Sequence, residues 1–147
     1  MTDLEAIRSL VAGDSGLAMV SVPRPDGSVH TSLVNAGVSA HPVTGEDVVA
    51  FVVRGDAYKL RLMLRDGRCT VAWRNGWQWG SVDGPVEVCG PDHALAGVDA
   101  ATVPELLRQV FRDAGGTHDD WGEYDRVMAQ ERRTAVFVRP DRFLGRP

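Results

Sequence analysis

Strand-like segments separated by short turns fill the first two thirds of the chain. Five of them are rich in apolar and β-branched residues: 17–22, 29–40, 48–53, 68–74 and 77–89. The turns between them include Pro23-Arg24-Pro25-Asp26-Gly27 and the hairpin signal Asn75-Gly76. Asp83-Gly84-Pro85 interrupts the last segment, where we expect one strand with a bulge. This order predicts a mostly antiparallel sheet.

Helical patterns occupy both sides of this β-rich region. Three motifs of the capping-box type mark helix starts: Thr2-x-x-Glu5, Thr102-x-x-Glu105 and Asp120-x-x-Glu123. We expect a short helix over 3–12 and two more helices within 99–133. A last strand over 134–138 and an extended tail over 140–147 should follow. Antiparallel strands with separate helices predict an α+β barrel with peripheral helices, formed as a single domain by residues 1–147.

The composition excludes several classes of protein. Hydrophobic residues make up 44% and charged residues 24% of the chain, as in an ordinary globular protein. A net charge of −4 argues against general binding to nucleic acid or to acidic membranes, so any basic function must be local. We see no leader pattern and no run of membrane-spanning length, and we expect a cytoplasmic protein. Cys69 and Cys89 should therefore be buried free thiols.

Motifs of known catalytic or metal sites are missing. The four histidines lie in different segments without the spacing of metal ligands, so no metal site is expected. His41 and His93 adjoin turn residues and are expected at the surface. Walker A, GxGxxG and nucleophile-elbow motifs do not occur. We therefore assign no catalytic acid, base or nucleophile.

One basic segment, residues 54–68, stands between two strand-like segments. Its middle has the pattern of a short helix, with Asp56 as the N-cap and Gly67 as the C-terminal stop. Lys59 then falls in the first helical turn. Because the N-terminus of a helix is already partly positive, a cation there is unusual unless an anion binds.

Further cations surround this lysine. Arg54 precedes the expected helix and Arg61 lies within it. Lys59 is also the only lysine in a chain with fifteen arginines, and a compact ammonium group is not equivalent to a guanidinium group. The pattern is consistent with an anion site. The alternative is that Lys59 pairs with Asp56 or Asp66 on a solvated helix face.

Aromatic and polar residues in the strands are the other unusual features. Trp73, Trp77 and Trp79 gather around a turn, where exposed indoles are costly. They are expected to cover a partner subunit, the core or a flat ligand. Ser32 and Asn35 lie among apolar residues of one strand, and a buried Asn needs hydrogen-bond partners. A ligand ring could supply them, or Asn35 could bond its neighbours.

Residues 58–71 resemble the K-x-R-N-L-x-x-D-P-R stretch of the split β-barrel flavin and deazaflavin proteins, the relatives of pyridoxamine 5′-phosphate oxidase. Within that superfamily the chain is most similar to the actinobacterial enzymes that bind the deazaflavin coenzyme F420. The turn at residues 76–79 and the pattern of residues 118–133 support this similarity. Three departures from the family pattern are Leu62 for Asn, Gly67 for Pro, and Ala57 for a basic residue.

The resemblance implies a fold and a site. The fold is a six-stranded split barrel of the FMN-binding type, and the protein is a homodimer with a cofactor in each of two grooves between the subunits. Lys59 and Arg61 would hold the phosphate or acidic tail of the cofactor, helped by Arg54. Candidate cofactor-binding residues are Ser32, Asn35, Val53, Arg54, Tyr58, Lys59, Arg61, Trp77, Trp79 and Arg132.

The implied function is that of an oxidoreductase. Hydride would pass between the ring of coenzyme F420 and a small electron-poor organic substrate. One alternative is an FMN-dependent oxidase or flavin reductase. Another is a carrier or sensor that binds the cofactor without turnover, and a purely structural dimeric barrel is the simplest remaining interpretation.

Overall fold

The computed structural model describes residues 3–146, and the predicted capping residue Thr2 lies outside them. Seven strands and four α-helices follow one another, with a short 3-10 helix (Ala100–Thr102) before α3. The elements are α1 (Asp3–Gly13), β1 (Leu17–Pro23), β2 (Val29–Ala40), β3 (Asp47–Val53), α2 (Tyr58–Asp66), β4 (Arg68–Asn75), β5 (Gln78–Cys89), α3 (Val103–Asp113), α4 (Trp121–Gln130), β6 (Thr134–Val138) and β7 (Arg142–Arg146).

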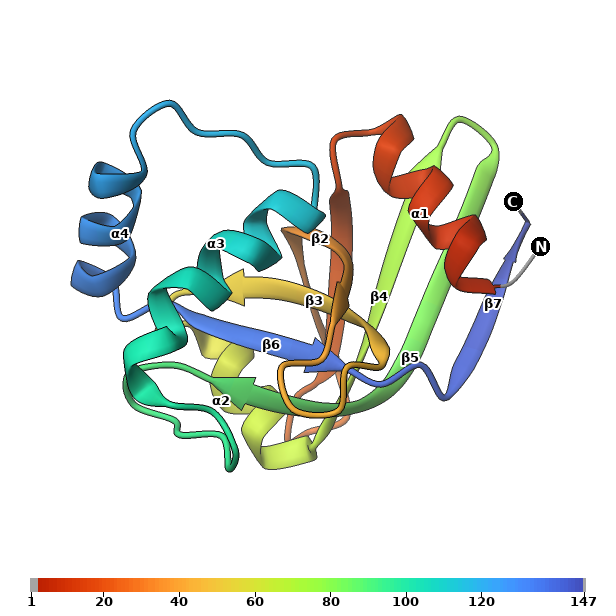
Figure 1. Cartoon of the computed structure of the whole chain (residues 1–147). Helices are drawn as coiled ribbons and strands as arrows, with labels where there is room; N and C mark the ends of the chain where they lie inside the picture. The colour runs from red at the N-terminus through yellow and green to blue at the C-terminus, as the bar shows by residue number, and fades with distance from the viewer. Residues whose placement is uncertain (1–2, 147) are drawn as a thin grey trace.

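Six of the strands close into an antiparallel barrel (Figure 1). They are paired in the order β4-β1-β2-β3-β6-β5, and β5 returns to pair with β4. Closure leaves no free edge among these six strands. The predicted α+β barrel is therefore confirmed.

The predicted extended tail is wrong, because residues Arg142–Arg146 form β7. This strand pairs with residues 79–83 of β5 outside the closed ring. Phe143 is half-buried against the barrel core and holds the strand in place. A five-residue strand with two arginines gives too weak a pattern to be recognised from sequence.

The interrupted segment at the end of the hairpin is one strand, but it contains a corner instead of the expected bulge. The register of β5 with β4 is unbroken up to Pro85, and from Val86 onward β5 pairs with β6. A Cβ atom on Gly84 would lie 1.7 Å from the carbonyl oxygen of Arg139. The chain therefore needs glycine where β5 passes between the two halves of the barrel.

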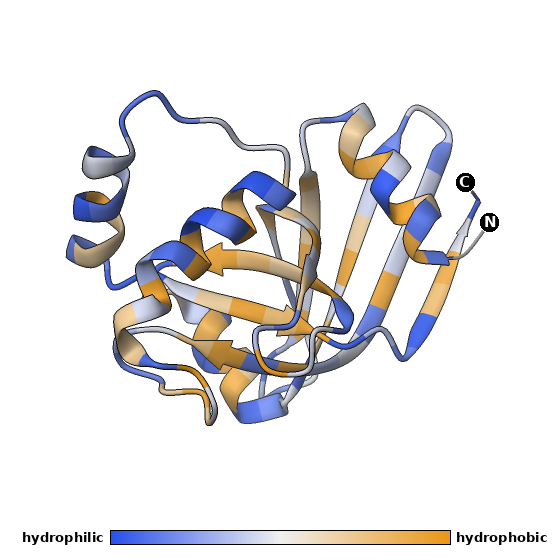
Figure 2. Ribbon diagram, in the orientation of Figure 1, coloured by the Kyte–Doolittle hydropathy of each residue, from blue (hydrophilic) through white to orange (hydrophobic). Residues whose placement is uncertain are grey.

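Apolar side chains form two clusters. The larger one fills the barrel and includes Val20, Phe51 and Trp73, with α1 and α2 contributing buried residues to it. The smaller one lies outside the barrel, between α3 and the strands β3 and β6. Figure 2 shows the apolar side of α3 turned toward these strands and a largely polar α4 beside it.

Two of the expected helix caps are wrong. Ala57, not Asp56, precedes α2 and makes no side-chain cap, because Asp56 pairs with Arg54 instead. Thr102 makes no cap to α3, since the preceding 3-10 helix is capped by Asp99. The caps at Gly67, which has a φ of 76°, and at Asp120, which accepts from the backbone N–H of Glu123, are confirmed.

His41 is buried, which contradicts its expected place at the surface. Its Nε2 lies 3.1 Å from Glu87 Oε1, and its Nδ1 accepts hydrogen bonds from the backbone N–H groups of Val43 and Thr44. The imidazole therefore organises the turn between β2 and β3. Cys69 and Cys89 are buried free thiols, as predicted.

Candidate functional site

A groove of about 470 Å³ lies where the start of β1, the middle of β2 and the end of β3 meet α2, α3 and α4. This volume is in the range typical of small-molecule sites. Apolar side chains line most of it: Leu17, Leu33, Val34, Val52, Val53, Ala57, Val110, Phe111 and Met128. The polar or charged residues in its wall are Asn35, Arg54, Lys59, Tyr124 and Arg133. A flat ring with a charged substituent matches this lining.

Lys59 is the second residue of α2 and is half-buried in the groove wall. Within residues 3–146 its ammonium group has neither a hydrogen bond nor an ion pair, so the alternative pairing with Asp56 or Asp66 is not found. Burial lowers the pKa of Lys59, and the nearby positive charge of Arg133 lowers it further. An anion bound here would relieve both effects.

Arg54 and Arg133 line the groove, and both form ion pairs with the carboxylate of Glu131. Arg54 Nη1 lies 3.1 Å from Glu131 Oε2, and Arg133 lies 2.9 Å from Glu131 Oε1. Arg54 also pairs with Asp56 at 3.1 Å. Their charges are thus partly neutralised, which leaves Lys59 as the unpaired cation among these groove residues.

Asn35 lies in the groove wall, but its amide already serves the fold. Its Nδ2 donates to the carbonyl oxygens of Ser15 at 2.7 Å and Ala114 at 3.2 Å. The expectation that Asn35 could bond its neighbours is therefore met. Its side-chain oxygen has no partner within residues 3–146, so this acceptor could bind a ligand N–H group.

Six of the ten predicted site residues lie outside the groove, and Ser32, Tyr58 and Arg61 are three of them. Ser32 is on the opposite face of β2 from Asn35, and its buried Oγ has no hydrogen-bond partner within the described chain. Tyr58 and Arg61 are exposed, with the Arg61 guanidinium 5.4 Å from the centre of the Tyr58 ring. The Tyr58 ring contacts His30 edge-on at 5.4 Å.

The tryptophans occupy different environments. Trp73 is buried in the barrel, where its Nε1 donates to the carbonyl oxygen of Ala36. Trp77 is 97% exposed at the hairpin tip, and Trp79 is 42% exposed on β5. Together with Met19, Arg74 and Arg146 these two border a separate open hollow. Trp77 and Trp79 therefore do not reach the groove of their own chain.

Arg132 and Arg133 are neighbours that point to different places. Arg132 has a φ of 49°, a left-handed conformation uncommon for residues other than glycine. It forms a two-pronged ion pair with Asp92, whereas Arg133 lines the groove. The predicted Arg132 is thus outside the groove, and the basic residue that lines it is Arg133.

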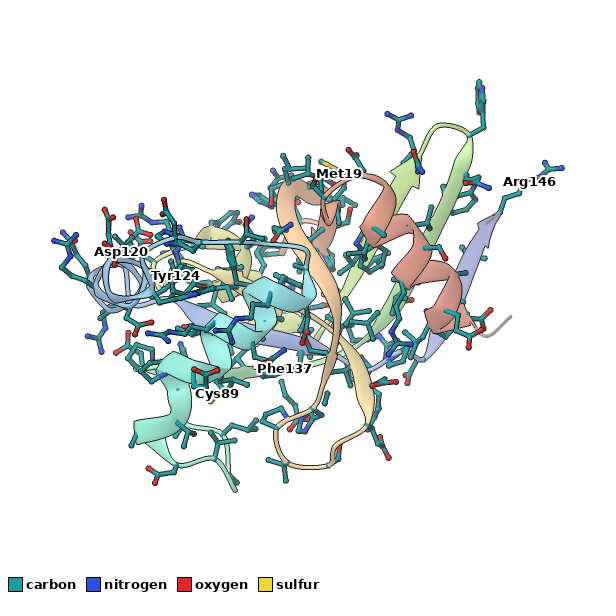
Figure 3. All side chains as sticks on the ribbon, turned by 45° about the horizontal axis from the view of Figure 1, so that its top comes forward. Met19, Cys89, Asp120, Tyr124, Phe137 and Arg146 are labelled. Carbon is teal, nitrogen blue, oxygen red and sulfur yellow. The ribbon has the colours of Figure 1, made fainter. Side chains whose placement is uncertain are left out.

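The wall from α3 and α4 was not predicted. Phe111, Tyr124 and Met128 have the helical spacing of core residues, and nothing in that spacing distinguishes a core from a groove. Phe111 and Tyr124 contact each other edge-on at 5.1 Å, and the Tyr124 hydroxyl donates to the carbonyl oxygen of Leu107 at 3.2 Å. Figure 3 shows Tyr124 on α4, on the side that faces the rest of the molecule.

The described residues suggest binding more than acid–base chemistry. Across residues 3–146, no three His, Cys, Asp or Glu side chains gather so as to hold a metal ion. Each helix in that range is too short or too polar to cross a bilayer. A groove with apolar walls and an unpaired cation can hold and orient an anionic molecule, which leaves the chemistry to that molecule.

No known protein-family model matches the sequence. Solved structures nevertheless share the fold. An F420 reductase superposes with a TM-score of 0.61 at 16% identity, covering 93% of this chain and 94% of the other. A pyridoxamine 5′-phosphate oxidase-related, FMN-binding protein from Nostoc punctiforme gives 0.60 at 11% identity, covering 96% and 78%. A protein of unknown function from Agrobacterium tumefaciens gives 0.66 at 15% identity.

The fold is therefore that of the split β-barrel proteins, as the sequence resemblance implied. The superposition with the Agrobacterium protein includes 97% of the present chain but only 55% of the other. The chain therefore spans about half the length of that structure.

Proposed function

We propose that the groove binds an anionic flavin-type cofactor, coenzyme F420, and that the protein is an F420-dependent reductase of small electron-poor organic molecules. The observation that carries this proposal is the unpaired, half-buried ammonium group of Lys59 in an apolar groove. A charge-assisted hydrogen bond from this group would be stronger than a neutral one. The F420 reductase among the structures of the same fold supports the choice of cofactor.

Each part of the groove has its own role in this proposal. Lys59 and Arg133 hold the acidic part of the cofactor, and Asn35 accepts a hydrogen bond from its ring. Phe111 and Met128 exclude water from one side of the ring. When bound, the deazaflavin supplies the hydride-transfer chemistry. The proton would come from water or from a nearby side chain.

FMN is the second candidate, and one observation favours it. Arg61, one of the cations that the resemblance assigned to a long acidic tail, lies outside the groove, and so does Arg132, another candidate cofactor-binding residue. Lys59 and Arg133 would be sufficient for one short phosphate. The FMN-binding protein of the same fold is consistent with this alternative.

We further propose that the protein is a homodimer whose interface closes the groove. Leu17 and Leu33 line the groove and are exposed on the outer face of β1 and β2. Met19 and Trp79 extend this apolar face. Exposed apolar surface of this kind is typical of interaction sites. A second copy would place its own residues, Trp77 among them, near the cofactor.

Titration of purified protein with F420 and with FMN tests the proposal. Lys59→Met removes the charge but keeps an unbranched chain, and we expect it to weaken binding roughly 10- to 100-fold, the value of one charged hydrogen bond. Arg61→Met, two residues away on the same helix but outside the groove, is the matched control. Equal affinity of the wild type and Lys59→Met for both cofactors would refute the site.

Turnover is tested separately. Reduced F420 bound to the protein should be oxidised on addition of a quinone, a nitro compound or an enone. The return of deazaflavin absorbance measures this oxidation. Stoichiometric binding without oxidation by any of the three would favour a carrier or sensor.

A further inference from the structure

A second cavity, of about 400 Å³, lies on the other side of Met128 and Arg133 from the groove. It is open to solvent on one side and is bordered by the loop between β5 and α3 together with α3 and α4. Cys89, labelled in Figure 3, stands at the end of β5 where this loop begins. None of the sequence-based site residues except Arg132 borders it.

Small residues in the wall leave the space of the cavity unfilled. Gly90, Ala94, Ala100 and Ala129 lie in its wall and cannot fill the space. Larger apolar side chains complete the lining: Leu95, Val98, Val103 and Leu107. Leu107 belongs to the outer apolar cluster, so the cavity extends directly from a packed core.

Charged groups at the rim of the cavity are already paired. Asp125 accepts two hydrogen bonds from Arg108, and Arg132 donates two to its own partner, Asp92. Arg133 pairs with Glu131. No unpaired ion is therefore left to bind a charged ligand, in contrast to the groove with its free Lys59 ammonium.

The only thiol in the wall is also uncharged. Burial raises the pKa of Cys89, which keeps the sulfur protonated at neutral pH. The cavity thus offers apolar contacts and a neutral thiol on its inner side.

We propose that this cavity binds an uncharged, mainly hydrocarbon small molecule with one or two ring systems. Apolar burial would drive the binding, and the size of the cavity is within the range of small-molecule sites. The molecule would contact Met128 and Arg133 from the side opposite the groove. The cavity shares only those two residues with the groove proposed for the cofactor.

Fluorescence titration with N-phenyl-1-naphthylamine, a neutral probe with two aromatic ring systems, tests the proposal. We expect one probe per chain, with emission that rises on binding. Ala94→Phe places a ring in the cavity and should weaken binding at least tenfold. Ala96→Phe, at a position in the same loop that is also exposed but lies outside the lining, should leave the affinity unchanged.

A second variant and a second probe complete the test. Ala129→Phe places a ring in the cavity from α4 and should weaken probe binding as Ala94→Phe does. The test therefore still stands if one of the two variants is unstable. The anionic relative 8-anilinonaphthalene-1-sulfonate should bind at least tenfold more weakly than the neutral probe. The proposal is overturned if the neutral probe does not bind, if both cavity variants bind it like the wild type, or if the anionic probe binds equally well.

The exposed sheet face is a possible competing site for the probe. It includes Met19, which lies well apart from Cys89 in Figure 3. Binding at that face would be lost in Met19→Asp and retained in Ala94→Phe, and this result would also overturn the proposal.

Discussion

Lys59 at the start of α2 and Arg133 at the entry to β6 line the same groove, and the positive charge of Arg133 helps to lower the pKa of Lys59. A half-buried ammonium group beside a second positive charge is unfavourable in the free protein. The two charges become favourable when an anion lies between them. The groove is therefore built at some cost to the unliganded fold.

This relationship predicts opposite effects of Lys59→Met on stability and on binding. The folded-state pKa of Lys59 lies below its unfolded value, so the charged form is disfavoured by folding at neutral pH. Removing the charge should raise the melting temperature of the ligand-free protein while it weakens cofactor binding. A lower melting temperature without ligand would show that Lys59 serves the fold instead.

Binding of F420 or FMN should also weaken at high pH. The ammonium form of Lys59 is the one that binds, and it is lost as the pH rises through the lowered pKa, below the usual 10.5. Affinities measured between pH 7 and 10.5 should fall for the wild type. For Lys59→Met the part of this fall in affinity that comes from loss of the ammonium proton should be absent. If the affinities of the two proteins fall equally with pH, Lys59 is not the group that binds the anion.

Tyr124→Phe should cost about 1 kcal/mol at pH 7, because the hydrogen bond to Leu107 is lost. Burial raises the pKa of Tyr124 from 10.0 to about 12, so its contribution to stability is complete below pH 10 and is lost between pH 10 and 12. The variant should therefore lose less stability than the wild type over that interval. Urea unfolding at pH 7 and pH 11 measures both effects.

The chain has one other tyrosine, which provides the control. Tyr58 is 40% exposed and makes no hydrogen bond with the described residues through its hydroxyl group. Tyr58→Phe should leave the free energy of unfolding at pH 7 within about 0.5 kcal/mol of the wild type. A loss equal to that of Tyr124→Phe would show that the Leu107 contact is not the cause.

Gly37→Ala should destabilise the protein by about 1–3 kcal/mol, the usual cost of overpacking. Its Cβ would lie 2.3 Å from the carbonyl oxygen of Asp113, because the end of α3 rests directly on β2. Gly122→Ala, at the start of α4, meets only the Asp120 carboxylate at 3.5 Å and should stabilise the helix by up to about 1 kcal/mol. Thermal unfolding of both variants compares the two positions.

Met19→Asp should shift the protein from dimer to monomer, since it places a charge on the apolar face proposed as the interface. Sedimentation velocity at several concentrations measures the change. Val43→Asp is the control, because Val43 is 50% exposed in the turn between β2 and β3, away from that face. A wild type that is monomeric at all concentrations would refute the dimer.

Hairpin turns and strand patterns were sufficient to predict the barrel. The strand β7 was missed because its five residues are mostly exposed and its stability comes from pairing with β5, which no local pattern reveals. The corner at Gly84 was interpreted as a bulge because it, too, depends on a distant part of the chain. A glycine next to a proline indicates an irregularity, whereas its kind depends on the strand that approaches from elsewhere.

The site was predicted in part. Asn35, Val53, Arg54 and Lys59 lie in the groove. Arg61 could have been excluded, because residues two apart on a helix differ by about 200° around its axis.

Arg133 could not have been chosen over Arg132 from the sequence. The choice depends on the left-handed backbone at Arg132, which turns the first side chain toward Asp92 and the second toward the groove. Nothing in a pair of adjacent arginines indicates such a turn.

The only lysine of the sequence lies in the wall of the groove. A reagent that is selective for side-chain amines therefore has a single target, and its rate of reaction reports whether that wall is covered. Because the pKa of Lys59 is lowered, a larger fraction of its side chain is the reactive free amine near neutral pH than in an ordinary lysine. Mass spectrometry of the labelled chain could thus count occupied grooves with any candidate molecule, coloured or not.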